Sequence, residues 1–136
     1  MQNQQPKRWE DRLNTFVRAV ASLQEFEQRK ELDVLQRAGL VKHFELTFEL
    51  AWKTLQDNQE AVGLERHPGP RPILQQAVKD GIIADYAIWE KMLKSRNTAA
   101  HIYREELAIE VESSIHAGFS QALKALSEKL QKYANA

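Results

Sequence analysis

The sequence contains no cysteine and few histidines. Disulfide bonds and thiol catalysis are therefore excluded, and a zinc site would need histidine and carboxylate ligands alone. None of the histidines stands in an HExxH or HxH spacing, so we expect neither a metal centre nor another cofactor. The four histidines are His43, His67, His101 and His116.

An excess of charge of either sign is also absent, because 19 Lys and Arg residues balance 19 Asp and Glu residues. Nonspecific affinity for nucleic acids comes largely from neutralising phosphates, so a neutral chain is not a general DNA-coating protein. A local basic site is not excluded. No apolar run approaches the ~18 residues of a membrane span, and the polar residues 1–12 lack the apolar core of a signal peptide. We expect a soluble, cytoplasmic protein with no membrane partner.

Glycine and proline are scarce, with five and four residues, and they mark the breaks between segments of helical periodicity. Alternation of β-branched residues is almost missing, which argues against strands. The 136 residues, 43% of them hydrophobic, are enough for one core, so we expect a single domain over 1–136 with a polar N-terminal tail at about 1–7. Four substantial helices with short connections predict an all-α, antiparallel up-and-down four-helix bundle with one extra short helix.

The expected helices follow from apolar residues that recur at steps of three and four. In the second helix, for example, Phe44, Phe48 and Trp52 share one stripe, which is typical of a core rather than of a cofactor site. Asp85 is a good N-cap for the fourth helix. We expect long helices at about 9–28, 31–61, 85–99 and 105–133, and a short helix at about 73–79.

One segment, residues 95–104, does not fit a plain bundle. Arg96 continues the apolar stripe of Trp89 and Met92 on its helix, and a guanidinium is almost never fully buried without a partner. We therefore expect an anionic or hydrogen-bonding group beside Arg96. The candidate carboxylates are Glu49, Glu105 and Glu106.

His101 follows Arg96 by five positions, which on an unbroken helix is about 140° around the axis. We expect the helix to end near Thr98 or Ala99 instead. The two side chains would then turn toward one cleft between neighbouring helices, with Tyr103 close to it.

Arg96, His101 and Tyr103, together with the small polar Asn97, suit a phosphodiester site that needs no metal. Arginine offers a fixed fork of donors to phosphate oxygens. Histidine titrates near neutrality and can move a proton to or from the oxygens of RNA. Cleavage of RNA needs an acid and a base, which a two-fold dimer would supply as two histidines. The plainer alternative is that Arg96 and His101 only cap carbonyls or pair with a carboxylate at a helix end.

Residues 96–103, RNTAAHIY, resemble the R-x4-H-x-Y motif of HEPN-domain proteins, including the polar residue after the arginine. The flanks agree as well. FELTFELAWKTL at residues 44–55 is similar to the FEYTFELAWKTL block of one branch of that superfamily. The proline and arginine before the short helix, and the Gly-Ile-Ile at residues 81–83, also fit. This branch is the nucleotidyltransferase substrate-binding protein family, which is HepT-like, and the resemblance covers residues 9–126.

The resemblance implies a helical bundle that forms a homodimer, with the Arg and His of both chains in one cleft. Many HEPN proteins are metal-independent ribonucleases. Small prokaryotic members are commonly encoded beside a minimal nucleotidyltransferase (MNT) as a toxin–antitoxin pair, in which AMP transfer to the motif tyrosine silences the toxin. Carried over to this chain, Arg96 would hold the scissile phosphate, His101 would be the acid or base, Asn97 would orient both, and Tyr103 would accept AMP.

Three functions are open at this point. The first is a HEPN ribonuclease toxin that cuts RNA as a dimer and is restrained by an MNT partner. The second is a non-catalytic subunit that binds a substrate or nucleotide for the partner's reaction, and the third is a scaffold whose motif only stabilises a dimer. The chain is not expected to be the nucleotidyltransferase itself, because it has no Gly-Ser turn and no Asp-x-Asp pair.

Overall fold

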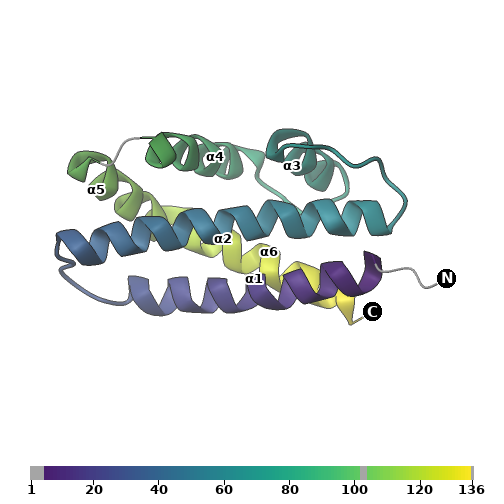
Figure 1. Cartoon of the computed structure of the whole chain (residues 1–136), viewed down its shortest axis with the longest axis horizontal. Coiled ribbons are helices and arrows are strands. Elements are labelled where there is room, and N and C mark those ends of the chain that lie inside the picture. The colour runs from purple at the N-terminus through teal and green to yellow at the C-terminus, as the bar shows by residue number, and fades with distance from the viewer. Residues whose placement is uncertain (1–4, 102–103, 136) are drawn as a thin grey trace.

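The computed structural model describes the backbone of residues 5–101 and 104–135 and the side chains of residues 8–98 and 104–135. This part of the chain is helical and contains no strand (Figure 1). The helices are α1 (Gln5–Glu27), α2 (Val34–Ala61), α3 (Pro70–Lys79), α4 (Tyr86–His101), α5 (Glu105–Ser114) and α6 (Ser120–Ala134), with a π-helical turn, η1 (Ile115–Phe119), between α5 and α6.

The predicted antiparallel four-helix bundle with one extra short helix is confirmed. Along the long axis of the molecule, α1, α2, α4 and α5–α6 run in alternating directions, and the start of α1 and the end of α6 lie at the same end of the bundle (Figure 1). The short α3 lies above the C-terminal half of α2, between α2 and α4 in the chain.

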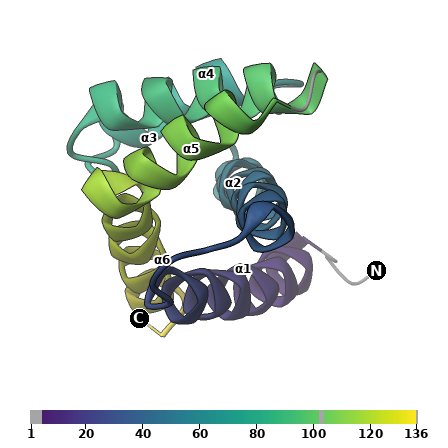
Figure 2. The ribbon, with the colours of Figure 1, turned by 90° about the vertical axis from the view of Figure 1, so that its left-hand side faces the viewer.

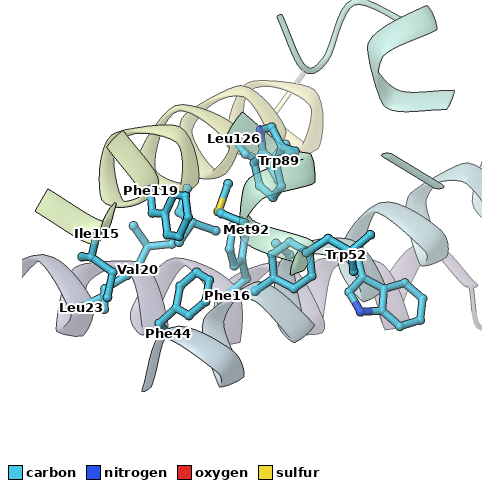
Figure 3. Close-up of a cluster of buried hydrophobic side chains, with 14 of the residues drawn as sticks. Phe16, Val20, Leu23, Phe44, Trp52, Trp89, Met92, Ile115, Phe119 and Leu126 are labelled. Atoms are coloured by element: carbon cyan, nitrogen blue, oxygen red, sulfur yellow. The ribbon is translucent and has the colours of Figure 1, made fainter. Parts of the chain in front are cut away.

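The core consists of the apolar stripes that the sequence predicts. On α2, Phe44 and Phe48 are fully buried, and the Phe44 ring stacks on Phe119 with 5.2 Å between the centroids. Figure 3 shows Phe44 of α2 facing Phe119 of η1, with core side chains of α1 around them and Leu126 of α6 beside Trp89 of α4. Burial of such rings is the largest single contribution to cores of this kind. The apolar stripe of α6 leaves the core at its C-terminal end, where Tyr133 is 43% exposed.

The helix starts differ from the predicted ones because local caps decide them. A capping box begins α2 at Val34 rather than near residue 31. The Asp33 carboxylate accepts a hydrogen bond from the Gln36 backbone (2.8 Å), and the Gln36 side chain accepts one from the Asp33 backbone (3.0 Å). Pro70 begins α3 three residues before the predicted start, since proline fits the first turn of a helix.

The predicted single C-terminal helix is wrong, because the chain bends between α5 and α6. Gly118 carries the bend, with φ 175° and ψ −22° inside the π-helical turn. A Cβ atom on Gly118 would lie 3.0 Å from Cδ1 of Ile88, so the glycine also allows α4 to approach the turn closely. Figure 2 shows the result, with α5 passing below α4 and α6 running on in a different direction beside α1.

The predicted end of α4 is also wrong, because the helix does not stop near Thr98 or Ala99 but continues to His101. Ala99 and Ala100 follow Thr98, and alanine has the highest helix propensity of all residues. Arg96 and His101 therefore stand five residues apart on one continuous helix, about 140° from each other around its axis.

A guanidinium from α2 fixes the start of α5, which follows directly after this segment. Arg37 is 17% exposed and donates hydrogen bonds to the Glu112 carboxylate (2.7 Å), to the Glu105 carboxylate and to the carbonyl of Leu32 (2.9 Å). The hydrogen bond to Glu112 and, to a smaller extent, the hydrogen bond to Glu105 raise the pKa of Arg37 above its usual value. We call this set the Arg37 clamp.

The clamp should be visible in thermal unfolding. Arg37→Met keeps much of the side chain's apolar length but removes the charge, which leaves Glu105 and Glu112 to repel each other. We expect this variant to melt at a lower temperature than the wild type by circular dichroism, with a smaller difference in high salt because salt screens the repulsion.

Arg18→Met is the matched control, since Arg18 is exposed on α1. Its melting temperature should stay within error of the wild type. Equal melting of the Arg37 and Arg18 variants would show that the clamp does not hold α5.

Candidate functional site

Arg96 lies where its spacing predicts, on the stripe of α4 that faces the bundle. Its guanidinium lies over the Phe48 ring, 5.7 Å from the centroid, and its Nε is 3.7 Å from a carboxylate oxygen of Glu49. The side chain is 24% exposed. Of the three predicted carboxylates Glu49 is therefore the partner, whereas Glu105 belongs to the Arg37 clamp and Glu106 is exposed.

The guanidinium of Arg96 is held in place, but its hydrogen-bonding capacity is not fully used. Its Nε is buried and has no hydrogen-bond partner among the described residues, because 3.7 Å to Glu49 is too long for a hydrogen bond. Leaving a buried donor unpaired costs about 1–3 kcal/mol. The packing over Phe48 and the attraction to Glu49 thus fix the side chain but leave hydrogen-bonding capacity unused.

Glu49 is itself shared, and this weakens its hold on Arg96. Lys53 lies one turn further along α2, with its Nζ 3.9 Å from the Glu49 carboxylate. Two cations therefore face one carboxylate at the seam between α2 and α4. This local excess of positive charge, in a chain of zero net charge, is the kind of small basic site that the composition left open.

The other predicted site residues are placed only in part. Asn97 is exposed on α4, and its side chain makes no hydrogen bond to a described residue. The backbone of His101 forms the last residue of α4, but its side chain lies outside the described residues, as does the whole of Tyr103. The α2 side of the site, by contrast, is described completely.

The remaining histidines have ordinary contacts. The ring of His43 lies 2.9 Å from the carbonyl of Ala19 on α1, which fits the structural role that its helix position suggests. His116 lies in η1, exposed, with its ring 3.4 Å from the Glu27 carboxylate. Among the described side chains, no group of three His, Asp or Glu residues stands close enough together to hold a metal ion.

Sequence reasoning found Glu49 on α2 but missed two other residues of that helix. Phe48 was predicted only as core, although it carries the Arg96 guanidinium, and Arg37 was not singled out at all. Phe48 could have been found, because a stripe residue opposite a buried arginine is its natural support.

Within the described parts of the chain, no helix is both long and apolar enough to span a membrane.

Comparison with known proteins places the chain in a family. The sequence model of a family described as "Nucleotidyltransferase substrate binding protein like" matches residues 11–132. The chain is 32% identical over 82 residues to a Haemophilus influenzae protein named "Probable ribonuclease HepT". That match covers 57% of this chain and 56% of the relative, so it spans little more than half of the curated protein.

The fold has a relative of known structure. A crystal structure of a protein from Thermus thermophilus superposes with a TM-score of 0.71 at 25% sequence identity, covering 88% of this chain and 98% of that one. The family match spans most of the residues, and the helical bundle agrees with it. The chain belongs to the nucleotidyltransferase substrate-binding-protein-like family, among the HEPN and HepT-like proteins.

Proposed function

We propose that this protein is a metal-independent ribonuclease of the HEPN type, the toxin of a toxin–antitoxin pair whose other member is a minimal nucleotidyltransferase. A homodimer would cut RNA in a cleft that contains Arg96, Asn97 and His101 of both chains. The observation that carries the proposal is the half-buried Arg96, whose Nε has no hydrogen-bond partner among the described residues. The name of the Haemophilus influenzae relative supports the same reaction.

Each residue has a definite task in this proposal. The forked guanidinium of Arg96 binds the oxygens of the scissile phosphate. One His101 takes the proton from the ribose 2′-hydroxyl, whose oxygen then attacks phosphorus. The bond from phosphorus to the 5′-oxygen breaks, and the second His101 of the dimer gives that oxygen a proton. The products are a 2′,3′-cyclic phosphate and a free 5′-hydroxyl. Asn97 orients the reacting groups.

The course of α4 favours a site shared between two chains. Arg96 and His101 stand about 140° apart around one continuous helix, so the two positions do not share a helix face. A two-fold axis beside α4 would bring Arg96 of one chain near His101 of the other. The reaction also needs two histidines, and each chain offers one in this segment.

Tyr103 completes the proposal as the point of control. Its phenolic oxygen would attack the α-phosphorus of ATP in the active site of the partner transferase, with pyrophosphate leaving and the phenolic proton passing to solvent. The attached AMP would fill the cleft and present its own phosphate to Arg96.

The second candidate is a non-catalytic subunit that binds a substrate or nucleotide for a two-component nucleotidyltransferase. The family description favours it. In this case Arg96 would bind a phosphate in the same way, but His101 would not be needed for turnover. Loss of activity on removing His101 therefore separates the two candidates.

The decisive experiment is cleavage of single-stranded RNA by protein expressed without its partner, in the presence of EDTA. We expect cleavage by the wild type and a loss of about 10²–10⁴-fold in His101→Ala, the usual contribution of an acid–base group. The matched control is His116→Ala, whose exposed ring lies on η1 and which should keep its activity. If clean, unmodified wild-type dimer does not cleave, the ribonuclease proposal is wrong and the binding subunit is favoured.

Control through Tyr103 is tested by co-expression with the nucleotidyltransferase. We expect the wild type to gain the mass of one AMP and to lose cleavage, while Tyr103→Phe gains no mass and still cleaves. Tyr133→Phe is the matched control, because Tyr133 is exposed near the C-terminal end of α6, and it should behave as the wild type. An AMP adduct on Tyr103→Phe, or silencing without any adduct, would contradict this assignment.

A further inference from the structure

A groove between α4 and α5 has no role in the proposed reaction so far. Its volume is about 220 Å³, and it lies between two helices that run close together. It is lined by Lys94, Ser95, Thr98, Leu107, Glu110, Val111 and Ser114. This volume is below that of pockets for drug-sized ligands and suits a single planar ring system.

Three hydroxyl groups of the groove make no hydrogen bond to a described residue, those of Ser95, Thr98 and Ser114. Other hydroxyls on the helices behave differently. Thr47 and Thr54 donate to the carbonyls four residues earlier, at 2.7 and 2.6 Å, as hydroxyls on helices commonly do. The groove hydroxyls thus keep both donor and acceptor capacity for a ligand.

The lining of the groove is mixed in character. Leu107 and Val111 of α5 supply apolar surface. Lys94 on α4 and Glu110 on α5 are exposed, and neither makes an ion pair with a described residue. Binding of an unpaired base requires apolar surface on which its ring can lie, hydrogen-bonding groups for its edge and a cation for a neighbouring phosphate.

The groove lies on the side of α4 that carries the position of His101. One side of α4 carries four positions that are separated by steps of three, one and three residues. They are Lys94, Asn97, Thr98 and His101. Arg96 stands on another side, over Phe48. A strand whose phosphate is near His101 would therefore pass the groove.

We propose that this groove binds one base of the RNA strand, next to the bond that is cut. This inference rests on the proposed ribonuclease function and adds its substrate preference. The ring lies on Leu107 and Val111, and Glu110 accepts a hydrogen bond from an exocyclic amine. The groove thus selects bases with an exocyclic amine, which are adenine, cytosine and guanine, over uracil, which has none. Lys94 binds a flanking phosphate and carries no base preference.

The test measures binding of short oligo(A), oligo(C) and oligo(U) RNA by fluorescence anisotropy, in the His101→Ala background so that RNA is not cut. Glu110→Ala is expected to reduce the preference for oligo(A) and oligo(C) over oligo(U) by about tenfold. The ratio is the measured quantity, because removing a negative charge also raises the affinity for every RNA. Glu106→Ala is the matched control, an exposed glutamate one turn earlier on α5, and should leave the ratio unchanged.

Lys94→Ala gives an independent readout. It should weaken binding of all three RNAs alike and lower the slope of log affinity against log salt by about one. Lys91→Ala, an exposed lysine one turn earlier on α4 and outside the groove, should have a smaller effect. Cleavage rates of the same variants with His101 intact should show the same order of base preference.

The outcomes separate the groove from the reaction. If the wild type cleaves RNA but the Glu110 and Glu106 variants have equal base ratios, the groove assignment is wrong and the ribonuclease proposal stands. If the wild type binds RNA through the groove but never cleaves, the assignment stands and the reaction is wrong. If neither binding nor cleavage of RNA occurs, the base site is overturned. It is also overturned if the groove variants bind RNA normally and lose only the binding of the nucleotidyltransferase partner.

Discussion

The ring of Phe48 holds α4 in place and thereby positions the candidate site. One ring of α2 packs against Trp89, with 6.1 Å between the centroids, and lies 5.7 Å from the guanidinium of Arg96 two turns later. These two contacts fix the rotation of α4 about its own axis. Because α4 is continuous to its last residue, that rotation also decides on which sides the positions of Lys94, Asn97 and His101 stand.

Periodicity predicted the bundle because each helix must bury one apolar stripe, and these stripes are long enough to identify. Periodicity failed at the ends of the helices, because single residues determine where a helix starts, ends or bends. The Asp33–Gln36 capping box delays the start of α2, and Gly118 bends a run of residues that reads as one uninterrupted stripe. A glycine within a helical pattern is a weak signal in a sequence, and its close contact with Ile88 is visible only in three dimensions.

The site was predictable to the extent that it is local in sequence. Arg96 stands on an apolar stripe, which was enough to predict that a carboxylate would face it, and Glu49 does. Arg37 could have been predicted to have a partner by the same argument, because it stands four residues before Val41 and seven before Phe44 on the stripe of α2. The identity of its partners could not, because Glu105 and Glu112 lie 68 and 75 residues further along the chain. The groove depends on how α5 lies against α4, which neither helix predicts alone.

In the proposed ribonuclease, Arg96 of one chain acts with His101 of the other, and a mixture of two inactive variants can show this pairing. Arg96→Ala and His101→Ala chains, each with a different affinity tag, are co-expressed, and dimers carrying both tags are isolated and assayed for RNA cleavage. Such dimers hold one Arg96–His101 pair across the interface. Cleavage should rise above that of either parent but stay well below the wild type, because one Arg96–His101 pair is complete while water must replace the second histidine as the acid for the leaving oxygen. Isolated mixed dimers as inactive as both parents would contradict a shared site.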